Sequence, residues 1–540
     1  MAEGASMKSS ADFSRTNVQV EGVDEPDIVK TDGEFIYFLS DNVVYIVHAY
    51  PPENASVFSK IKLDDDAYAE NIFVRDDKLI IFSNLYRKAG NYSYTPTTLI
   101  KIYDIGNKSH PIQWKEMEMD GDYFDARMID EYIYVIAVED VYYILPVYIN
   151  GTLNPPQLRV DNNTEKFPPS SIYYVDMPYG MDGATNVVSI NLENGAIDKK
   201  SFITGNTASL YVSKNNIFLA CEKYGSPVIY ENPQYYGEST IIYRISLENG
   251  SIYHRATGEV PGRVLNQFSM DEYSGFLRVA TTTGSTWVGN SYSGIYVLSM
   301  NMNIVGKVEK IAPGERIYAA RFMGEKVYLV TFRETDPFFT INLSNPYVPE
   351  VAGELKIPGY SDYLHPYDEN HIIGIGKETV EAGENKNFAW YQGLKIALFN
   401  VSDFKNPIEM DKVVIGDRGT DSNSLHDHHA FLFSKEKELL AIPVSLYLID
   451  NETKEMYNDT ASIYGDFVFQ GLYVYRINLK DGIVFKGRIT HLENLTGYWD
   501  YSHFIKRALY IGDTLYTFSD AMIKINDMKN LEERGEISLL

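Results

Sequence analysis

Cysteine is almost absent from this chain of 540 residues, in which Cys221 is the only one. A single thiol cannot form an intramolecular disulfide, so we expect burial of apolar side chains to hold the fold together. The sequence also lacks any window of eighteen apolar residues, which argues against a transmembrane helix. The first residues, MAEGASMKSSADFS, contain no apolar core of a signal peptide. If the protein is exported, we expect its leader or anchor to lie outside this sequence.

Positive charge is also scarce. The chain has 48 Lys and Arg against 74 Asp and Glu, which gives a net charge of −26. Nucleic acids and anionic membranes require clustered cations, so this balance argues against both as partners. Cationic partners remain open, and so does the plainer explanation that the charge keeps the protein soluble.

Aromatic residues, in contrast, are plentiful: they make up 14% of the chain and include 43 Tyr. Together with Val, Ile and Thr they gather in short runs, which is typical of pleated, half-buried strands. The composition therefore predicts an all-β protein.

A repeated hairpin sequence runs through the chain. VVSINLENGAI begins at Val187, IYRISLENGSI at Ile242 and VYRINLKDGIV at Val474. In each, two alternating strands flank a turn that ends in Asn-Gly or Asp-Gly, which is a strong hairpin signal. A second version of this turn contains proline, as in IYDIGNKSHPI from Ile102 and LFNVSDFKNPI from Leu398. About thirty residues before these proline-containing hairpins lies another pair of short strands, so the repeating unit has four strands, a to d.

Four-stranded units repeated without helices between them predict a single-domain β-propeller. We expect residues 1–14 to be a disordered tail and residues 15–540 to form the propeller, with RTNVQVEG at 15–22 available to extend the last blade. We count nine blades, with eight as the alternative if one unit is an insertion. The nine units lie near residues 27–63, 69–119, 122–205, 207–258, 264–312, 315–358, 361–415, 424–490 and 502–540.

The connections between strands b and c carry nearly all the extra length, so the elaboration falls on one face of the propeller. Loops on a rigid scaffold often bind partners. Trp287, Trp390 and Trp499 lie in this group of loops and are candidate ligand-binding residues, since exposed tryptophan suits a sugar ring or a protein hot spot. The alternative is that they form small apolar cores within long loops.

Asn-x-Ser/Thr sequons occur eleven times, against roughly four expected by chance. This excess indicates an exported, glycosylated protein; the alternative is that Asn, Ser and Thr simply concentrate in β-turns. The candidate acceptors are Asn54, Asn91, Asn107, Asn150, Asn162, Asn249, Asn342, Asn400, Asn451, Asn458 and Asn494.

Histidine is concentrated in SLHDHHAFLF, residues 424–433, in a chain with ten histidines. We expect this stretch to be strand a of the eighth unit, so that alternation places His426 and His428 on one face and Asp427 and His429 on the other. Histidines on the neighbouring inner strands complete a candidate ligand set for Zn, Cu or Ni. That set is His365, His426, His428 and His503, with Asp362 and Asp421 as further ligands or partners of the imidazoles. The alternative is that these side chains hydrogen-bond across blades.

Cationic side chains also fall on expected inner strands. Their plainest use is in ion pairs between blades, and the alternative is an anion-binding funnel. The channel-lining candidates are Arg75, Arg127, Arg321 and Arg507. The chain contains no phosphate-binding glycine loop, no Gly-x-Ser-x-Gly and no His-Glu-x-x-His, so no catalytic residue is assigned.

Several stretches resemble one prokaryotic family of secreted proteins, whose β-propeller domain is distantly related to WD-40 repeats. They include TNVQVEGVDEPDIVKTDGEFIYFLS near the start, DHHAFLFSKEKELLAIPV in the eighth unit and RALYIGDTLYTFS near the end. The resemblance covers residues 14–540. It implies a propeller and an extracellular or cell-envelope location, and it carries over no catalytic residues.

We therefore expect a monomeric, non-enzymatic binding module outside the cytoplasm. A surface protein, peptide or glycan would bind in the funnel or on the face of the b–c loops. The alternatives are a metalloprotein or metal-dependent enzyme with a histidine-lined channel, and a structural component of the cell envelope.

Overall fold

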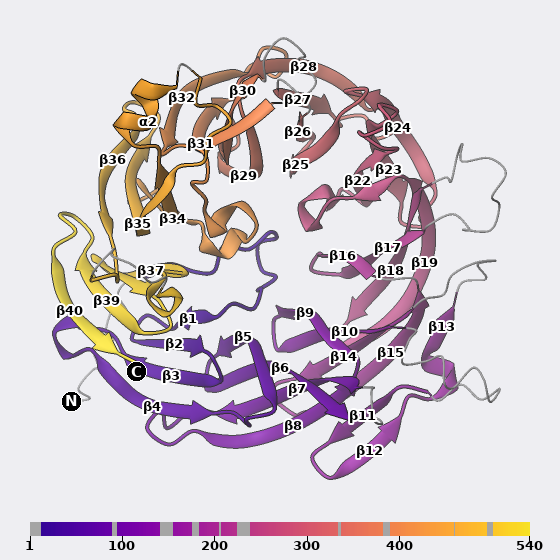
Figure 1. Cartoon of the computed structure of the whole chain (residues 1–540). Helices are drawn as coiled ribbons and strands as arrows, with labels where there is room; N and C mark the ends of the chain where they lie inside the picture. The colour runs from indigo at the N-terminus through magenta and orange to yellow at the C-terminus, as the bar shows by residue number, and fades with distance from the viewer. Residues whose placement is uncertain are drawn as a thin grey trace, which may run out of the picture.

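The computed structural model describes residues 12–88, 94–140, 155–174, 183–204, 207–223, 238–332, 336–381, 389–457, 459–493 and 500–539. Nine sheets, built mainly from antiparallel strands, stand around a central axis (Figure 1), and the chain passes through them in order except that β11 and β12 return from blade 3 to blade 2. Each sheet is one blade, numbered here 1 to 9. The prediction of an all-β, nine-bladed propeller is confirmed, and the eight-bladed alternative is excluded.

The first three blades contain strands β1 to β15. Blade 1 comprises β1 (Val29–Thr31), β2 (Phe35–Ser40), β3 (Val43–His48) and β4 (Ser56–Lys62). Blade 2 comprises β5 (Ala67–Arg75), β6 (Lys78–Lys88), β7 (Tyr94–Asp104), β8 (Ile112–Asp120), β11 (Gln157–Val160) and β12 (Asn163–Lys166). Blade 3 comprises β9 (Asp122–Ile129), β10 (Tyr132–Asp140), β13 (Ile172–Tyr174), β14 (Gly183–Asn191) and β15 (Ile197–Thr204).

The next three blades contain strands β16 to β28. Blade 4 comprises β16 (Thr207–Val212), β17 (Asn216–Lys223), β18 (Ser239–Glu248) and β19 (Ser251–Pro261). Blade 5 comprises β20 (Arg263–Val264), β21 (Met270–Tyr273), β22 (Phe276–Thr283), β23 (Tyr292–Ser299) and β24 (Ile304–Ile311). Blade 6 comprises β25 (Arg316–Met323), β26 (Lys326–Phe332), β27 (Asp336–Asn342) and β28 (Glu350–Ile357).

The last three blades contain strands β29 to β40. Blade 7 comprises β29 (Tyr360–Asp368), β30 (His371–Glu381), β31 (Ala389–Asn400) and β32 (Ile408–Ile415). Blade 8 comprises β33 (Leu432–Ser434), β34 (Leu439–Leu448), β35 (Asp466–Asn478) and β36 (Gly482–Ile489). Blade 9 comprises β37 (Arg507–Ile511), β38 (Thr514–Phe518), β39 (Met522–Asp527) and β40 (Glu533–Ser538).

Short helices account for the remaining regular structure in the described residues. The α-helix α2 (Asn451–Met456) lies between β34 and β35. The 3-10 helices are η1 (Pro52–Asn54), η2 (Pro169–Ser171), η3 (Gln267–Ser269), η4 (Asn423–Leu425), η5 (His428–Ala430) and η6 (Tyr501–His503). No helix in the described part of the chain is long and apolar enough to cross a membrane.

The turns show why the repeated hairpin sequence forms these blades. Between β18 and β19, Asn249 and Gly250 both have positive φ, at 49° and 79°, and Glu248 pairs with Ser251. A two-residue turn with positive φ at both positions twists in the same sense as its strands, and Asn-Gly is the sequence that adopts it most readily. The hairpin prediction is confirmed at this position.

Apolar side chains from adjacent blades pack together between the sheets. One cluster joins blade 1 to blade 9 and includes Phe38, Tyr45, Tyr516 and Phe518. The hydroxyl of Tyr45 donates a hydrogen bond to the carbonyl of Leu539 (3.1 Å). Within the described residues, the first and last blades therefore close the ring by side-chain packing, with four strands from one stretch of chain in each sheet.

Residues 15–22 do not extend the last blade, so that expectation is wrong. Only Phe13 forms a bridge with β37, at Ile511, and residues 15–22 contain no strand. In Figure 1 this part of the chain is the indigo trace that enters the middle of the ring. The short contact at Phe13 leaves the rest of the segment free to reach other blades.

Several long b–c connections are extended strands, which corrects the expectation of irregular loops. Strands β6 and β7 pair as far as Lys88 and Tyr94, and β30 and β31 pair as far as Glu381 and Ala389. The connection inserted in blade 3 sends the hairpin β11–β12 to the outer edge of blade 2, where β11 pairs with β8. The elaborated face is thus built partly from regular sheet.

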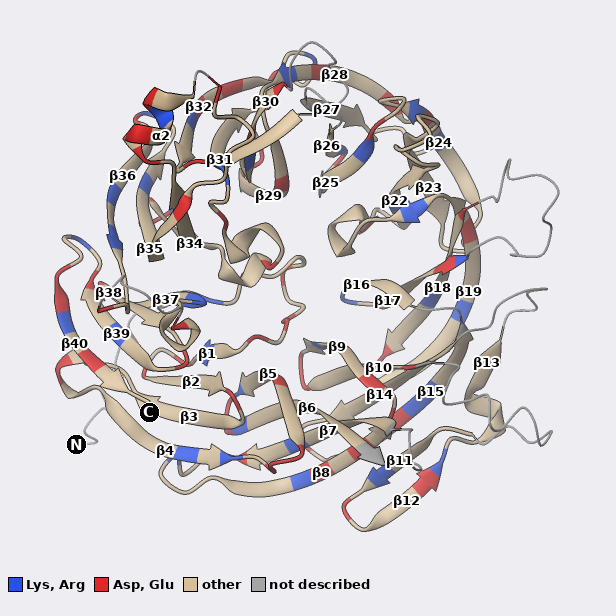
Figure 2. Ribbon diagram, in the orientation of Figure 1, with Lys and Arg blue, Asp and Glu red and all other residues tan. Residues whose placement is uncertain are grey.

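Charges of both signs lie along the outer strands. Figure 2 shows acidic and basic residues interspersed on β8 and β40. Such mixing on a strongly acidic chain favours solubility and limits edge-to-edge association of exposed strands.

Candidate functional site at the centre of the ring

The N-terminal segment, defined here as residues 12–28, runs from blade 9 across the channel to blade 1. It begins beside β37, where the amide of Ser14 donates to the carbonyl of Tyr510 (3.0 Å). It then reaches blade 5, where the side chain of Gln19 donates to the carbonyl of Gln267 (2.9 Å). Because these contacts lie on different sides of the ring, the segment spans the channel.

The second half of the N-terminal segment is attached to blades 3 and 2. Asp24 forms a bridge with Met128 of β9, and Asp27 forms one with Ile72 of β5. In both pairs the amide and the carbonyl exchange hydrogen bonds of 2.8 to 3.2 Å. Two extra backbone pairings on inner strands hold the segment more firmly than side-chain contacts alone would.

The histidine-rich stretch faces this segment, but it is not a strand. Residues 423–430 form η4 and η5, and the innermost strand of blade 8 begins only at Leu432. The side chain of Asp427 accepts a hydrogen bond from the amide of His429 (3.0 Å) and so caps η5. Capping by Ser, Asp or Asn competes with strand formation, so the prediction that His428 and His429 lie on opposite faces is wrong.

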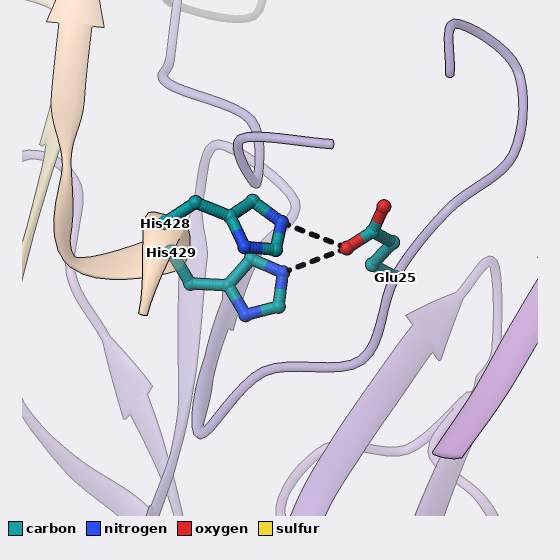
Figure 3. A group of neighbouring side chains, drawn as sticks. All are labelled: Glu25, His428 and His429. Atoms are coloured by element: carbon teal, nitrogen blue, oxygen red, sulfur yellow. Dashed lines mark hydrogen bonds and ion pairs between the residues drawn. The ribbon is translucent and has the colours of Figure 1, made fainter. Parts of the chain in front are cut away.

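Both imidazoles instead point at one carboxylate, that of Glu25 (Figure 3). Nε2 of His428 lies 2.8 Å and Nε2 of His429 lies 3.2 Å from Oε2 of Glu25. The side chain of Glu25 is only 3% exposed. Its other oxygen, Oε1, accepts the backbone amide of Gln19 (2.9 Å), which folds the segment around the carboxylate.

Arg127 of β9 supplies the compensating charge for Glu25. Its guanidinium lies 3.9 Å from Oε2 of Glu25 and 2.6 Å from a carboxylate oxygen of Asp125, and it donates to Oε1 of Gln267 (3.0 Å). Burial by itself would raise the pKa of Glu25. The charge of Arg127 and the hydrogen bonds from both histidines hold that pKa well below its ordinary value, so the carboxylate is ionised.

A second buried ion pair lies next to the first. Arg507 of β37 donates from Nε to Asp27 (2.9 Å) and from Nη2 to Asp427. Burial opposes the charge on Arg507, yet the two carboxylates raise its pKa. One side chain of blade 9 thereby joins the N-terminal segment to the cap of η5.

The two histidines have opposite pKa shifts. Burial, reinforced by the neighbouring His429, lowers the pKa of His428 despite its contact with Glu25. Burial also disfavours the charged form of His429, but Glu25, Asp27 and Asp427 together raise its pKa above the ordinary value. The surrounding carboxylates therefore stabilise the charged form of His429 more than that of His428.

The four histidines expected to share a metal do not come together. Nδ1 of His365 lies 3.1 Å from the hydroxyl of Tyr363, and its ring packs on Phe431, with burial and Arg321 lowering its pKa to about 3. His426 is exposed. His503 lies on η6, with Nδ1 2.8 Å from Asp500. Of the set, only His428 reaches Glu25.

The two aspartates proposed as partners of the histidines lie elsewhere. Asp421 accepts a hydrogen bond from Lys377 of β30 (2.8 Å). Burial, aided by the nearby charge of Asp421 and opposed by Lys377, raises the pKa of Asp362 to about 7. The two carboxylates form a separate electrostatic group on blade 7 and its connection to blade 8.

The remaining two channel arginines have weaker partners. Arg75, at the end of β5, lies 3.5 Å from the exposed carboxylate of Asp76. The guanidinium of Arg321 lies over the ring of Phe268 at 5.2 Å, and its Nη1 has no hydrogen-bond partner among the described residues.

A cavity of about 860 Å³ lies against the N-terminal segment. Its walls include Arg15 of the segment, Arg75 of β5, His365 of β29 and Phe433 of β33. The lining reaches Thr31, Arg75 and Asp130, which lead into short a–b turns. The cavity therefore lies in the channel toward the face opposite the long b–c connections.

The tryptophans proposed as ligand-binding residues do not line this cavity. Trp287 is 97% exposed between β22 and β23. Trp390 lies in β31, where the guanidinium of Arg418 packs over its ring at 4.5 Å. Trp499 lies outside the described residues.

Seven of the eleven sequons fall in the described part of the chain. Their asparagines are exposed at Asn54, Asn107, Asn162, Asn249 and Asn451 and half-buried at Asn342 and Asn400. Asn91, Asn150, Asn458 and Asn494 lie outside the described residues. At Asn400 the side-chain oxygen accepts bonds from the amide (2.9 Å) and hydroxyl (2.6 Å) of Ser402, so this sequon also forms a turn.

Sequence reasoning missed Glu25, which organises the site. Its partners His428 and His429 lie about 400 residues away along the chain. The only signal was local: EGVDEPD, residues 21–27, places several carboxylates beside an otherwise apolar stretch within the part of the sequence that carries the family resemblance.

Two archaeal proteins and one solved structure are among the proteins similar to this chain. The chain is 28% identical to an uncharacterized protein of Archaeoglobus fulgidus over 98% of this chain and 85% of that protein. It is 31% identical to an uncharacterized protein of Methanocaldococcus jannaschii over 96% of this chain and 82% of that one. The solved structure of Hsv2 from Kluyveromyces lactis aligns with 72% of this chain and 99% of its own, with 8% identity and a TM-score of 0.33.

Residues 13–531 match the family described as the beta propeller domain. Propellers of this kind serve in general as binding or scaffold modules. With this match over nearly the whole chain, and two archaeal relatives aligned over most of their length, the prediction of a prokaryotic propeller family is confirmed. The chain belongs to the beta propeller domain family.

Proposed function

We propose that the protein is a non-enzymatic binding module that acts outside the cytoplasm and holds part of a partner protein in the central cavity. The cavity carries this proposal. Its volume of about 860 Å³ lies in the range of well-formed ligand sites, and residues of the N-terminal segment and of blades 1, 2, 3, 7, 8 and 9 form its walls.

The lining carries charges of both signs: Lys30 pairs with Asp24 and Asp27 with Arg507, while Glu21 and Asp130 are the remaining carboxylates. We infer that its other two cations receive the carboxylates of an acidic peptide. Arg15 is exposed and Arg75 has only an exposed carboxylate 3.5 Å away, so both guanidiniums are available to a ligand carboxylate. Phe13 and Phe433 add half-buried apolar surface. The lining contains neither Trp nor Tyr, the side chains best suited to stacking on sugars and hydrogen-bonding them, which disfavours a glycan here.

A location outside the cytoplasm is supported by the sequons. Five of the seven that the structure describes have an exposed asparagine, as glycosylation requires. For protein isolated from its own cells, we expect peptide mass spectrometry to find glycan on several of these asparagines. Unmodified asparagine in every such peptide would argue against this location.

The ligand proposal is tested with charge reversal in the cavity. Immobilised hexapeptides containing Asp or Glu are screened with the full chain, and the best binder is measured by fluorescence anisotropy. We expect the double variant Arg15→Glu/Arg75→Glu to weaken its Kd at least tenfold, because two charge-assisted bonds become repulsive. We also expect the wild-type affinity to fall as salt is added.

The matched control is Arg476→Glu, which makes the same charge change on β35 at a half-exposed arginine paired with Asp481. This variant should bind the peptide as the wild type does. If both variants lost peptide affinity equally, the loss would come from the change in net charge and not from the cavity arginines. If the protein bound sugars on a glycan array but bound no peptide, its ligand would be a sugar and not an acidic peptide.

A further inference from the structure

Hydrogen-bond donors crowd one oxygen of Glu25. Besides Nε2 of His428 at 2.8 Å and Nε2 of His429 at 3.2 Å, the side-chain nitrogen of Gln267 lies 3.3 Å from the same Oε2. The guanidinium of Arg127 follows at 3.9 Å. A carboxylate oxygen has about two lone-pair directions, so three donor groups within 3.3 Å exceed what it can accept.

The contact between Gln267 and His428 adds to this conflict. The side-chain oxygen of Gln267 accepts a hydrogen bond from Arg127, so the side-chain nitrogen of Gln267 can only donate. This nitrogen lies 3.5 Å from Nε2 of His428. If Nε2 of His428 carries a proton, two donors face each other. If it carries none, its lone pair is free to bind a cation together with the carboxylate.

The three ligand atoms already have the spacing of a metal site. Oε2 of Glu25 and Nε2 of both histidines all lie within 4.8 Å of one another. Zinc bonds of about 2.0 to 2.2 Å in a tetrahedron separate neighbouring ligand atoms by roughly 3.3 to 3.6 Å. The distances of 2.8 and 3.2 Å to Glu25 require only a small outward movement to reach that range.

The charges around the group favour a divalent cation. The carboxylates of Glu25, Asp27, Asp125 and Asp427 face two guanidiniums, those of Arg127 and Arg507. With neutral imidazoles, four negative and two positive charges leave a net charge of −2 around the buried carboxylates of Glu25 and Asp27. Burying unbalanced charge is unfavourable, and one divalent ion would balance it.

Two carboxylates also lie near the second ring nitrogen of His429, the one that does not face Glu25. Nδ1 of His429 lies 3.6 Å from Asp427 and 4.0 Å from Asp27. Carboxylates near the second nitrogen of a ligand histidine commonly orient the ring and strengthen its basicity. Both aspartates are in turn held by Arg507.

We propose that Glu25, His428 and His429 bind a structural divalent transition metal, with zinc as the best match, and that the ion fastens the N-terminal segment to η5. Two imidazoles and one carboxylate suit Zn²⁺ better than Ca²⁺ or Mg²⁺, which prefer oxygen ligands throughout. Three protein ligands would leave a tetrahedral ion one further position for water. We assign it the linking role because its ligands come from two separate parts of the chain, the N-terminal segment and η5. This site differs from the set His365, His426, His428 and His503 expected from the sequence, since it shares only His428.

The experiment compares metal content in untagged, full-length variants. After exposure to ZnCl₂ and desalting, the wild type should retain about one equivalent of zinc by elemental analysis, and His428→Ala and His429→Ala should each lose it. Glu25→Gln should weaken zinc affinity at least tenfold. His426→Ala, which alters an exposed histidine in the same stretch, should keep the full equivalent and serves as the matched control.

A spectroscopic measurement on the wild type makes the test independent of how well the variants fold. X-ray absorption at the zinc edge should show a nitrogen and oxygen shell near 2.0 to 2.1 Å with the scattering pattern of imidazole. Wild-type protein that retains no zinc after desalting would overturn the proposal. So would zinc that persists in a folded His429→Ala variant, or that is lost equally from His426→Ala.

Discussion

Replacing Arg507 by methionine should lower the free energy of unfolding by about 3 to 5 kcal/mol. The methionine fills a similar volume but removes the cation from the buried carboxylate of Asp27 and from that of Asp427, which is 39% exposed. Removing one partner of a buried ion pair is far costlier than removing an exposed pair, because the remaining charge stays desolvated. Urea unfolding followed by intrinsic fluorescence and circular dichroism measures the change.

Arg476→Met is the control for this variant. Arg476 pairs with Asp481 at 2.7 Å, but its side chain is 41% exposed, so its loss should cost about 0 to 1 kcal/mol. A change of less than about 1 kcal/mol for Arg507→Met would show that the buried pair contributes little. In that case the attachment of the N-terminal segment to blades 8 and 9 would have to come from other contacts.

Replacing Glu25 by alanine should destabilise the protein by about 2 to 4 kcal/mol. The substitution removes the acceptor shared by His428, His429 and Gln267 and the one that binds the amide of Gln19. It also leaves Arg127 with less compensation, although Asp125 remains paired with it. We expect trypsin to cleave after Arg15, the exposed basic residue of the segment, faster than in the wild type, since fewer contacts then hold the segment.

Glu21→Ala is the matched control, since Glu21 is exposed on the same segment. This variant removes one carboxylate at a site without a buried partner and should change stability by less than about 0.5 kcal/mol. If Glu25→Ala and Glu21→Ala proved equally stable and equally resistant to trypsin, Glu25 would not anchor the segment.

The architecture could be predicted because its signals are local. A hairpin such as the one at Asn249 and Gly250 forms from neighbouring residues, and its turn residues are those that adopt the required backbone angles most readily. Repetition of that hairpin fixes the sheet type, and the count of repeats gives the blades. Each of these features lies within a few tens of residues, so the sequence alone determines them.

The central site could not be predicted because it joins distant parts of the chain. Glu25 meets His428 only after nine blades close a ring, and no local pattern records that meeting. Local capping also prevented the strand that the sequence predicted. Asp427 caps η5, so two consecutive histidines point the same way. The sequence analysis therefore singled out His428 but not its partner Glu25.

The N-terminal segment is the feature that connects fold and proposed function. It contributes Glu25 to the buried group and Arg15 to the cavity wall, so the same seventeen residues would shape both. A segment fixed at both ends presents a preorganised surface, which reduces the entropy lost when a partner binds. Loosening the segment should therefore weaken binding even where the ligand does not touch Glu25.

Hydrogen exchange of the wild-type protein tests most directly whether the N-terminal segment is fixed across the channel. Backbone amides that donate within or from the segment, those of Ser14, Gln19, Val23, Asp24 and Asp27, should exchange at least about a hundredfold more slowly than in an unstructured peptide. Exchange of these amides at the rate of an unstructured peptide would contradict the account, because the segment would then not be held by the blades.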